Sequence, residues 1–522
     1  MVISLKGNKG ETRLTIQIHE EIGRLIQYGL QKGLITKWDK EYTINQLLDV
    51  LQLDSYEKSE VPYEELDSPV DILNNMLDWA YEYGVLKENT VTYRDLLDTK
   101  IMSCLMPRPS EVKKNFEEIL DQEGPEKATS YFYQLSKAVH YIRTDRIAKN
   151  ESWKSKTEYG DLEITINLSK PEKDPKAIAA AKNLASTDYP KCLLCKENVG
   201  YKGRVNHPAR QNLRVIPVEL DGEQWFMQFS PYVYYNEHAI VFSHEHRPMK
   251  ISRNTFARLL DFVQKYPHYF IGSNADLPIV GGSILNHDHY QGGYHEFPMA
   301  KAEMEETFTF SNFDQVKAGI VKWPMSVIRL QSENRVQLIE LANQILHLWR
   351  EYSDEQVEIL AHSNEERHNT ITPIARKKGN QFELDLVLRN NRTDERHPLG
   401  IFHPHNEVHH IKKENIGLIE VMGLAVLPGR LKEEMKALGE YLVKDEMKKI
   451  KEDERTAKHY DWAMKMKNQY GEFPNETIHD VLRKEVGQVF SIVLEHAGVF
   501  KRNKQGKSAF LRFIEYIQEN VR

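Results

Sequence analysis

The sequence has few cysteines and no long apolar segment. Only three of its 522 residues are cysteine, namely Cys104, Cys192 and Cys195, which excludes a disulfide framework and is typical of proteins in a reducing compartment. No run of about 18 apolar residues occurs, and the first ten residues lack the apolar core of a signal peptide. These absences predict a cytoplasmic protein that does not enter a membrane.

A marked excess of either charge is also missing. The chain has 70 basic and 77 acidic side chains, and its net charge is −7. This balance argues against a general nucleic-acid binder, so any anionic ligand must meet a local basic cluster. At 522 residues the chain is too long for one ordinary core, and two or three domains are expected.

Hydrophobic periodicity predicts a mixed α+β chain. Residues 1–158 have helical spacing, with a helix start at Ser68-Pro69 and another at Pro107 to Ser110. The elements expected after them are a strand at 162–168, a helix begun by Asp174-Pro175, a hairpin at 213–229, a strand at 238–242 and a helix at 256–263. A strand through Ile279 to Gly293 completes this unit.

A similar order of elements follows. It consists of a strand at 327–330, a helix at 336–349, a hairpin at 370–388 and a strand at 400–405. The last strand would present His403 and His405, as the earlier one presents His287 and His289. This repetition indicates a duplicated α+β unit. From residue 431 the chain is helical and highly charged, which is typical of solvated helix faces.

The segment from Asp276 to Gly293 has the strongest chemical pattern. Because side chains alternate along a strand, His287, His289 and Gln291 are expected on one face. The glycine pairs 281–282 and 292–293 would let another group approach the backbone closely. Such a face can form a metal site or a nucleophile with its helper, or it can be ordinary surface polarity.

Cys192 and Cys195 form a Cys-x-x-Cys pair that can give two thiolates to one zinc ion. A structural zinc site needs four ligands, and no second Cys-x-x-Cys exists, so histidines must complete it. The best candidates are His246 and His287, which follow or lie on expected strands. A redox pair is the alternative, but the flanking lysines and leucines favour zinc.

The segment 203–214 is basic and rich in amides. Arg204, Asn206, Arg210 and Arg214 suit phosphate oxygens and nucleotide edges, because arginine offers a rigid set of donors. A solvated loop is the alternative.

If His287 binds zinc, His289 remains free to attack phosphorus. A histidine nucleophile forms a reactive N–P bond, so transfer through it is reversible. The Gln291 amide can donate to the non-bridging oxygens without supplying a proton. This suits a phosphate leaving group, whose second pKa of about 6 makes protonation unnecessary. The residues therefore predict nucleotidyl transfer from a sugar nucleotide or a dinucleotide.

At these residues the chain resembles the second, mainly bacterial class of the galactose-1-phosphate uridylyltransferase family. The resemblance lies in the segments 276–293, Cys192 to Asn198, Asn206 to Arg210, 368–374 and 400–423, and it departs from the pattern at Asn286. It implies an α+β fold with two histidine-triad-like antiparallel-sheet halves. The implied limits are 1–158 for a helical N-terminal region, 159–325 and 326–430 for the halves, and 431–522 for a helical C-terminal region.

The resemblance also implies a reaction and a set of site residues. The reaction is the transfer of uridylyl from UDP-glucose to galactose 1-phosphate in galactose metabolism, by a ping-pong route with His289 as nucleophile and Gln291 beside it. Structural zinc is expected on Cys192, Cys195, His246 and His287. Substrate contacts are expected from Arg204, Asn206, Arg210, Arg214, Asn274, Ser283, His403, His405 and Glu420. The partners are UDP-sugars and hexose 1-phosphates, with no nucleic acid and no membrane, and a homodimer is left open.

Two alternatives differ in function. One is another histidine-triad transferase, such as a dinucleoside-polyphosphate phosphorylase, which predicts adenine rather than uracil specificity. The other is a zinc-stabilised nucleotide-binding or scaffold protein, which would keep the metal ligands but show no turnover.

Overall fold

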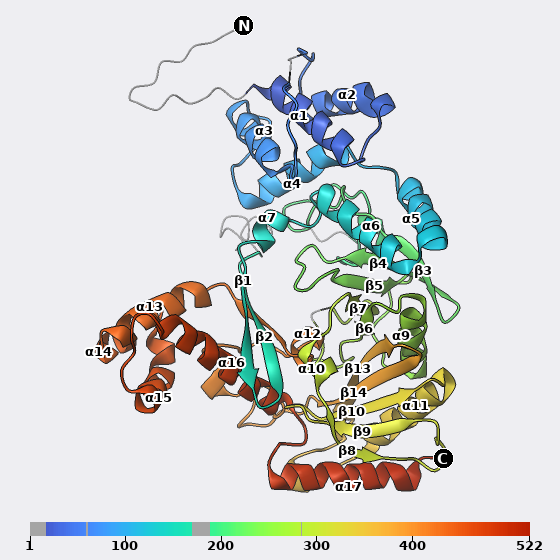
Figure 1. Ribbon diagram of the computed structural model, residues 1–522, viewed down its shortest axis with the longest axis vertical. Coiled ribbons are helices and arrows are strands. Elements are labelled where there is room, and N and C mark those ends of the chain that lie inside the picture. Colours follow the sequence, from blue (N-terminus) through green and yellow to red (C-terminus); the bar gives the residue numbers. More distant parts are fainter. Residues whose placement is uncertain (1–16, 59–60, 170–187, 283) are drawn as a thin grey trace.

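A ten-stranded antiparallel sheet forms the centre of the molecule, with helical regions above and beside it (Figure 1). The computed structural model describes residues 17–58, 61–169, 188–282 and 284–522. The helix expected at Asp174-Pro175 and the site residue Ser283 lie outside this range. Among the described residues, no helix is both long and apolar enough to span a bilayer.

The N-terminal region is helical as far as Ile147, as predicted, but residues 151–157, which the predicted helical region 1–158 included, form a strand that pairs with the one after it. Its helices are α1 (Ile18–Gln31), α2 (Lys40–Leu51), α3 (Val70–Glu82), α4 (Val91–Ser103), α5 (Pro109–Glu123), α6 (Pro125–Ala138) and α7 (Thr144–Ile147). Pro109 is the first residue of α5, where its missing N–H costs nothing and its fixed φ favours the helix.

The large sheet consists of two five-stranded halves. The first half, from its edge inward, is β3 (Ile216–Leu220), β4 (Glu223–Phe229), β5 (Ala239–Ser243), β7 (His289–Gly293) and β6 (Phe270–Gly272). The second half, from its edge inward, is β8 (Met304–Phe308), β9 (Lys317–Val321), β10 (Val327–Ser332), β14 (Gln381–Asn390) and β13 (Asn369–Lys378). The pair β6–β13 joins the halves at the centre.

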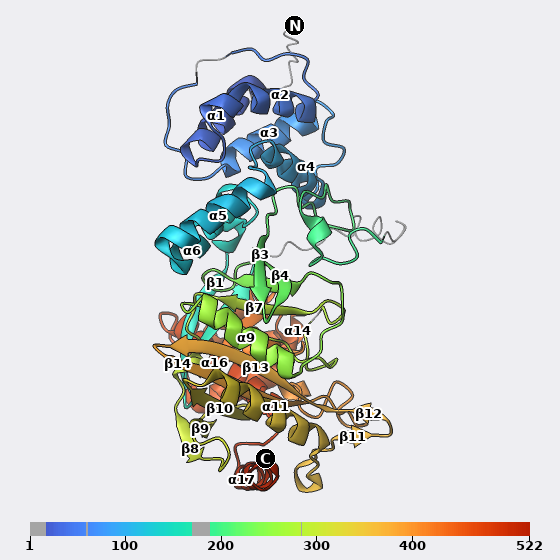
Figure 2. The same ribbon diagram turned by 90° about the vertical axis from the view of Figure 1, so that its right-hand side faces the viewer.

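Two helices cover the same face of the sheet (Figure 2). Helix α9 (Arg253–Lys265) connects β5 to β6, and α11 (Arg335–Glu351) connects β10 to β13, so both halves have the same chain order. The side chain of Asn334 caps α11 by accepting from the N–H groups of Val336 and Gln337. Its buried residues Leu338, Leu341, Ala342, Ile345, Leu346 and Trp349 recur at helical spacing and pack on the sheet. The prediction of a duplicated α+β unit is confirmed.

The topology identifies corresponding strands in the two halves. β7 pairs with the central strand β6, and β14 pairs with the central strand β13, so β14 corresponds to β7. Leu384 and Leu386 of β14 belong to the same core as the buried residues of α11. Because side chains alternate along a strand, Glu383 and Asp385 are on the opposite face of the sheet, as His289 and Gln291 are in the first half.

The strand expected through His403 and His405 does not form. Residues 401–405 make a turn that leads into a short 3₁₀ helix, Asn406–Val408. Pro404 between the two histidines has no N–H to give to a neighbouring strand. The true counterpart of the His289 strand is β14, which the sequence pattern had placed in a hairpin without chemistry.

The strand expected through 279–293 is also shorter than predicted. Only His289 to Gly293 form β7, and Ile279 before it has a φ of 72°. The N–H of Asp288 bonds to the carbonyl of Arg247 at 2.7 Å, outside any named strand. His287 consequently precedes the strand instead of sharing a face with His289 and Gln291.

Smaller elements cover the opposite face of the second half. A three-stranded sheet contains β1 (Glu151–Thr157), β2 (Gly160–Asn167) and β15 (Leu424–Pro428), where β15 runs parallel to β2. With α10 (Pro298–Lys301) and α12 (Leu418–Val421), it shares an apolar core with Val327, Ile374 and Val387. Two short strands, β11 (His362–Ser363) and β12 (Glu366–Arg367), form a separate hairpin.

The C-terminal region is helical, as predicted. It contains α13 (Leu431–Val443), α14 (Met447–Glu452), α15 (Tyr460–Tyr470), α16 (Ile478–Ala497) and α17 (Lys504–Asn520). The domain limits proposed from sequence stay predictions. Because β8 and β9 pair beside β10, the sheet favours a division between residues 293 and 304 over one at 325.

Candidate active site

His289 lies at the start of β7 and points away from α9. The next residue, Tyr290, faces α9 and stacks on Trp225 with ring centroids 4.8 Å apart. Strand alternation therefore directs His289 and Gln291 to the opposite face. Of the three residues expected to share one face of a strand, these two do.

The tautomer of His289 follows from its hydrogen bond. Its Nδ1 lies 2.8 Å from the carbonyl oxygen of His287, and a carbonyl can only accept, so Nδ1 carries the proton. Burial lowers the pKa of His289 to about 4, which keeps the ring neutral near pH 7. No described residue hydrogen-bonds to Nε2, so its lone pair is available to an electrophile.

In the described part of the chain, the side chain of Gln291 has a hydrogen-bond contact with one other side chain. Its Oε1 lies 3.0 Å from Nε2 of His238, which immediately precedes β5. Gln291 is half-buried, whereas His238 is buried.

Cys192, Cys195, His246 and His287 form a compact group of metal-ligand atoms. The Sγ atoms of Cys192 and Cys195 are 3.5 Å apart, the Nδ1 of His287 is 3.2 Å from Cys192 Sγ, and the Nδ1 of His246 is 3.2 Å from Cys195 Sγ. Tetrahedral bonds of about 2.0–2.3 Å to one ion require ligand separations of about 3.3–3.8 Å, so the four residues fit a metal of the zinc type. The predicted ligand set is thus assembled in one place.

The surroundings of this group support metal binding. The Nε2 of His287 donates to the carbonyl of Ser243 at 2.9 Å, which leaves Nδ1 unprotonated toward the sulfurs. Asn198 donates to the carbonyl oxygens of Cys192 and Cys195, at 2.8 Å each, and so fixes the turn that carries both thiols. The Nε2 of His207 holds Asn198 in turn, 2.7 Å from its Oδ1.

The basic segment 203–214 lies beside this turn. Its side chains contact other protein groups or solvent, and they do not all point to one place. Arg204 donates to Asn206 and to the hydroxyl of Tyr201, each at 2.6 Å, and Arg210 stacks over Tyr141. Both arginines are half-buried and Asn206 is exposed. Their substrate contacts stay predictions.

Arg214 is turned toward the N-terminal region. Its Nε and Nη2 donate to the carbonyl of Pro107 at 2.9 and 2.7 Å, and its Nη1 donates to the carbonyls of Gln211 and Leu213. Burial lowers its pKa to about 10. The guanidinium therefore ties this segment to Pro107, two residues before the start of α5.

Asn274 and Glu420 meet at the start of α12. Asn274 Oδ1 accepts from the N–H of Leu418 at 2.9 Å, and Glu420 Oε2 accepts from that of Gly417 at 3.0 Å. Glu420 Oε1 accepts from Lys412 at 2.9 Å. The two expected substrate residues, far apart in sequence, thus cap the same helix.

His403 and His405 are not side by side on a strand. His403 is buried, and its Nε2 lies 3.1 Å from Oδ1 of Asn415. The ring of His405 stacks on that of His496 of α16, with centroids 4.4 Å apart. The backbone N–H of His405 donates to Nδ1 of His496. Glu407 lies 3.4 Å from Nε2 of His496. Protein groups therefore contact both ring nitrogens of His496.

The glycines around His289 let other groups approach the backbone closely, as predicted, and these groups belong to the protein itself. A Cβ atom on Gly282 would lie 2.7 Å from the Asn274 amide, and one on Gly292 would lie 2.7 Å from the carbonyl of Phe270. A Cβ on Gly293 would lie 2.6 Å from the carbonyl of Glu237. The tight packing of neighbouring backbone requires glycine at these positions.

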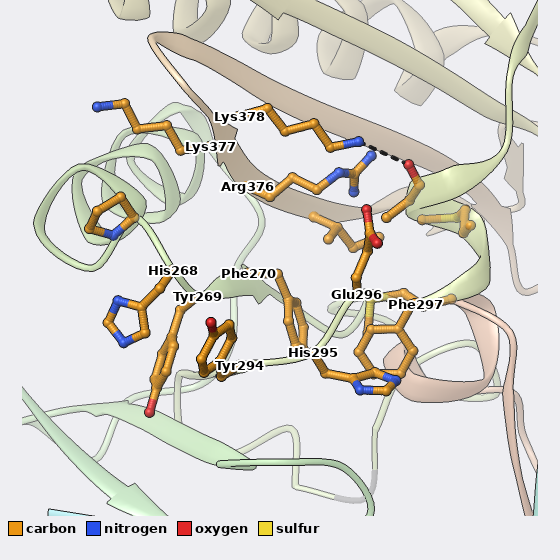
Figure 3. A pocket seen from close by; sticks show the side chains of 15 residues that line it. His268, Tyr269, Phe270, Tyr294, His295, Glu296, Phe297, Arg376, Lys377 and Lys378 are labelled. Atoms are coloured by element: carbon orange, nitrogen blue, oxygen red, sulfur yellow. Dashed lines mark hydrogen bonds between the residues drawn. The ribbon is translucent and has the colours of Figure 1, made fainter. Parts of the chain in front are cut away.

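A cavity of about 180 Å³ lies beyond the C-terminal end of β7 (Figure 3). Its walls include Phe270, Tyr294, His295, Phe297, Lys377 and Lys378. Lys378 is directed to the carbonyl of Ala300, 3.1 Å away, and His295 lies 2.8 Å from Glu163 of β2. None of the described site residues expected from the sequence lines this cavity.

Sequence reasoning missed two residues of this region, His238 and Asn198. His238 is 53 positions from Gln291 and opens an unremarkable apolar strand, so no spacing pattern indicates the contact. Asn198 carried a weak signal, because a buried turn with two thiols needs donors for its carbonyl groups.

Comparisons with known proteins cover nearly the whole chain. Residues 33–248 match the family model described as galactose-1-phosphate uridyl transferase, N-terminal domain, and residues 262–464 match the C-terminal domain of the same family. A galactose-1-phosphate uridylyltransferase of Halalkalibacterium halodurans is 63% identical over 500 residues, covering 96% of this chain and 98% of that protein. The Bacillus subtilis protein of the same name is 56% identical over 504 residues, covering 96% and 98%. A crystal structure of yeast Ap4A phosphorylase Apa2 aligns over 58% of this chain and 90% of its own, with 13% identity and a TM-score of 0.30, too low to bear on function.

Proposed function

Because the chain belongs to the galactose-1-phosphate uridylyltransferase family, we propose that it transfers the uridylyl group of UDP-glucose to galactose 1-phosphate through a covalent bond to His289. The observation that carries this proposal is the state of His289. Its Nδ1–H donates to a fixed backbone carbonyl, and its Nε2 lone pair is free on the same face as Gln291.

The first half-reaction follows from this geometry. Nε2 of His289 attacks the α-phosphorus of UDP-glucose, the N–P bond forms, and the bond to the bridging oxygen of glucose 1-phosphate breaks. The imidazole becomes cationic, and its Nδ1–H bond to the His287 carbonyl stabilises that charge. The departing phosphate monoester needs no general acid, because its second pKa is about 6.

The second half-reaction reverses these bond changes. A phosphate oxygen of galactose 1-phosphate attacks the same phosphorus, and the N–P bond breaks. UDP-galactose leaves, and His289 returns to its neutral form. The amide N–H groups of Gln291 donate to the non-bridging oxygens as negative charge develops on them in both steps.

Zinc would be held by Cys192, Cys195, His246 and His287, since this donor set and its spacing suit that ion. The bound ion would fix the Cys-x-x-Cys turn against the start of β7. The residues Arg204, Asn206, Arg210, Asn274, His403, His405 and Glu420 belong to the proposal as substrate contacts, and Ser283 lies outside the described residues. A cytoplasmic location and small-molecule partners complete it.

Labelling tests the nucleophile. The protein incubated with UDP-glucose labelled in its α-phosphate is expected to retain an acid-labile, base-stable label on His289. His289→Asn is expected to abolish both labelling and exchange, whereas the exposed His347→Asn on α11 changes neither. Full exchange activity in His289→Asn would disprove the assignment.

The two alternatives predict other results in the same assay. A dinucleoside-polyphosphate phosphorylase would accept adenine rather than uracil nucleotides, and a scaffold would show no turnover. The names of the relatives favour the uridylyltransferase over both.

Metal analysis tests the zinc site. About one zinc per chain is expected in the purified protein, and Cys192→Ser is expected to lose it, since three remaining ligands hold the ion more weakly. Cys104→Ser in the N-terminal region serves as the control and should retain the metal. A wild-type protein with far less than one equivalent, together with a normally folded Cys192→Ser variant, would contradict the proposal.

A further inference from the structure

The Gln291 side chain has two ends with opposite hydrogen-bonding roles. Its NH₂ group can donate to the oxygens of a phosphoryl group, but its carbonyl oxygen would repel them. Rotation by 180° about the last side-chain bond exchanges the two ends at almost no intrinsic cost. A useful Gln291 therefore needs a neighbour that selects one orientation.

His238 is the neighbour that can select it. Its Nε2 lies 3.0 Å from Oε1 of Gln291, and among the described residues this is the one side chain that hydrogen-bonds to the amide. His238 is buried, and its Nδ1 is a buried atom with no hydrogen-bond partner in the described part of the chain.

The unpartnered Nδ1 determines the tautomer of His238. If Nδ1 carried the proton, a buried N–H donor would be left unpaired, which costs about 1–3 kcal/mol. If Nε2 carries it, the donor is paired with Oε1 of Gln291, and only an acceptor lone pair stays unused. The ring therefore donates from Nε2, and the amide oxygen accepts.

The surrounding turn holds the His238 ring in place. The rings of Tyr235 and Tyr234 lie 4.4 and 5.7 Å from it, centroid to centroid. The hydroxyl of Tyr235 donates to the carbonyl of Gly292 at 3.1 Å, on the residue after Gln291. Tyr269 donates to the carboxylate of Glu237 and so fixes the residue just before His238. Turn 234–238 thus contacts β7 at two consecutive residues.

We propose that His238 is a positioning residue for uridylyl transfer. Its Nε2–H holds the carbonyl end of Gln291, so that the NH₂ end faces the phosphoryl group bound to His289. This inference rests on the proposed function and extends it to a residue that never touches the substrate.

Two substitutions separate the hydrogen bond from the packing. His238→Phe keeps an aromatic ring between the tyrosines but has no donor, and His238→Gln restores an N–H at nearly the same distance from the backbone. The Phe variant is expected to lower kcat about 10- to 100-fold while KM for UDP-glucose changes less than about threefold, because the misoriented amide is felt mainly in the transition state. The Gln variant is expected to recover most of this loss.

A double-mutant cycle with Gln291→Ala distinguishes positioning from general damage. If His238 acts through Gln291, His238→Phe causes no further loss once the amide is absent. Multiplicative losses, or an unchanged kcat in His238→Phe, would overturn the proposal.

Nuclear magnetic resonance tests the contact without reference to activity. In protein labelled with ¹⁵N-histidine, His238 is expected to have its proton on Nε2, and the Nε2 signal is expected to move in Gln291→Ala. A proton on Nδ1 would overturn the inference even in an active enzyme. If UDP-glucose left no phosphate label on His289, the proposed function would be refuted. The ¹⁵N signals of His238 would still show whether its ring holds the side-chain amide of Gln291.

Discussion

At the scale of single residues, His287 links the metal group to the nucleophile. Its Nδ1 faces the thiols, its Nε2 bonds to Ser243, and its carbonyl accepts the Nδ1–H of His289. A shift of this one residue would therefore change both the ligand set and the tautomer of His289.

Asp385 and Glu383 show what occupies the corresponding place in the second half. Asp385 is fully buried, and Arg329 and Arg376 both donate to it at 2.7 Å. Arg376 also contacts Glu383. Burial alone would raise the pKa of Asp385, but the two arginines outweigh it and lower the pKa. These side chains neutralise one another, so this half has structural charges where the first has reactive groups.

Removal of the Asp385 charge is expected to destabilise the protein strongly. Asp385→Asn leaves two buried arginines with one carboxylate, and breaking a buried pair costs about 3–5 kcal/mol. Urea-induced unfolding would measure the loss. Glu117→Gln, which breaks an exposed pair with Lys113, is the control and should cost less than about 1 kcal/mol. A loss as small as that of the control would contradict the structural role of Asp385.

Ligand residues were predictable from sequence where chemistry limits the choice. A four-ligand site with one Cys-x-x-Cys requires histidines. His246 follows one expected strand and His287 lies on another, so the set could be predicted. His238 could not be, because a lone histidine beside an apolar strand has no distinguishing pattern. Its partner becomes visible only when β5 and β7 are paired.

At the scale of elements, the turn 234–238 explains why Gly293 ends β7. A Cβ atom on Gly293 would lie 2.6 Å from the carbonyl of Glu237 and 2.8 Å from the Tyr235 ring. The turn can contact β7 closely because residue 293 has no side chain. The contact between His238 and Gln291 depends on this approach.

Gly293→Ala is therefore expected to lower activity as well as stability. The added methyl group would push the turn away, cost about 1–3 kcal/mol and lengthen the bond between His238 and Gln291. Unfolding by urea and kcat for uridylyl transfer would measure both effects. Gly379→Ala in the β13–β14 turn is the control, because its Cβ would meet no atom within 4 Å although its φ is +59°. Equal activity in the two variants would refute this account.

Long periodic elements were predicted well, and short ones less so. The apolar residues of α11 recur at helical spacing, and the hairpin of β13 and β14 has two long apolar segments joined by a short turn. Both elements can therefore be recognised from their own residues. Residues 400–405 and 279–288 contain enough apolar residues to suggest strands, but Pro404 in the first and the bend before His289 in the second prevent pairing. Whether such a short segment pairs with a neighbouring strand depends on residues that are distant in sequence. The local sequence pattern holds no information about those residues.

At the scale of the whole molecule, buried acids connect separate helices and make stability depend on pH. Glu434 of α13 accepts from His459 at 3.0 Å and from Lys458 and Arg430 at 2.5 and 2.6 Å. Burial would raise the pKa of Glu434, but its bonds to His459 and Lys458 and the charge of Arg430 lower it to about 2. The ionised form is therefore the one that holds the C-terminal helices together.

The sign of the pH effect follows from linkage. The pKa of Glu434 is lower in the folded state than its ordinary value of 4.5, so its stabilisation is complete above about 4.5 and is lost as pH falls toward 2. Glu434→Gln is expected to be less stable than wild type at pH 7, with a difference that shrinks below pH 4.5. Thermal unfolding at several pH values would measure this, with the exposed Glu440→Gln on the same helix as control. A difference that grows on acidification would contradict the prediction.

The two outer strands of the ten-stranded sheet also affect how the molecule behaves at high concentration. Open strand edges can recruit another chain and begin aggregation. Helix α5 packs against β3. On β8, Glu305 and Glu306 are exposed, the register shifts between Met304 and Glu306, and Arg502 pairs with Glu305 at 2.6 and 2.8 Å. A bulged edge that carries the charge of an exposed glutamate, unpaired among the described residues, is a poor partner for an identical edge. The bulge at β8 and the helix beside β3 therefore oppose edge-to-edge pairing of two copies of this sheet.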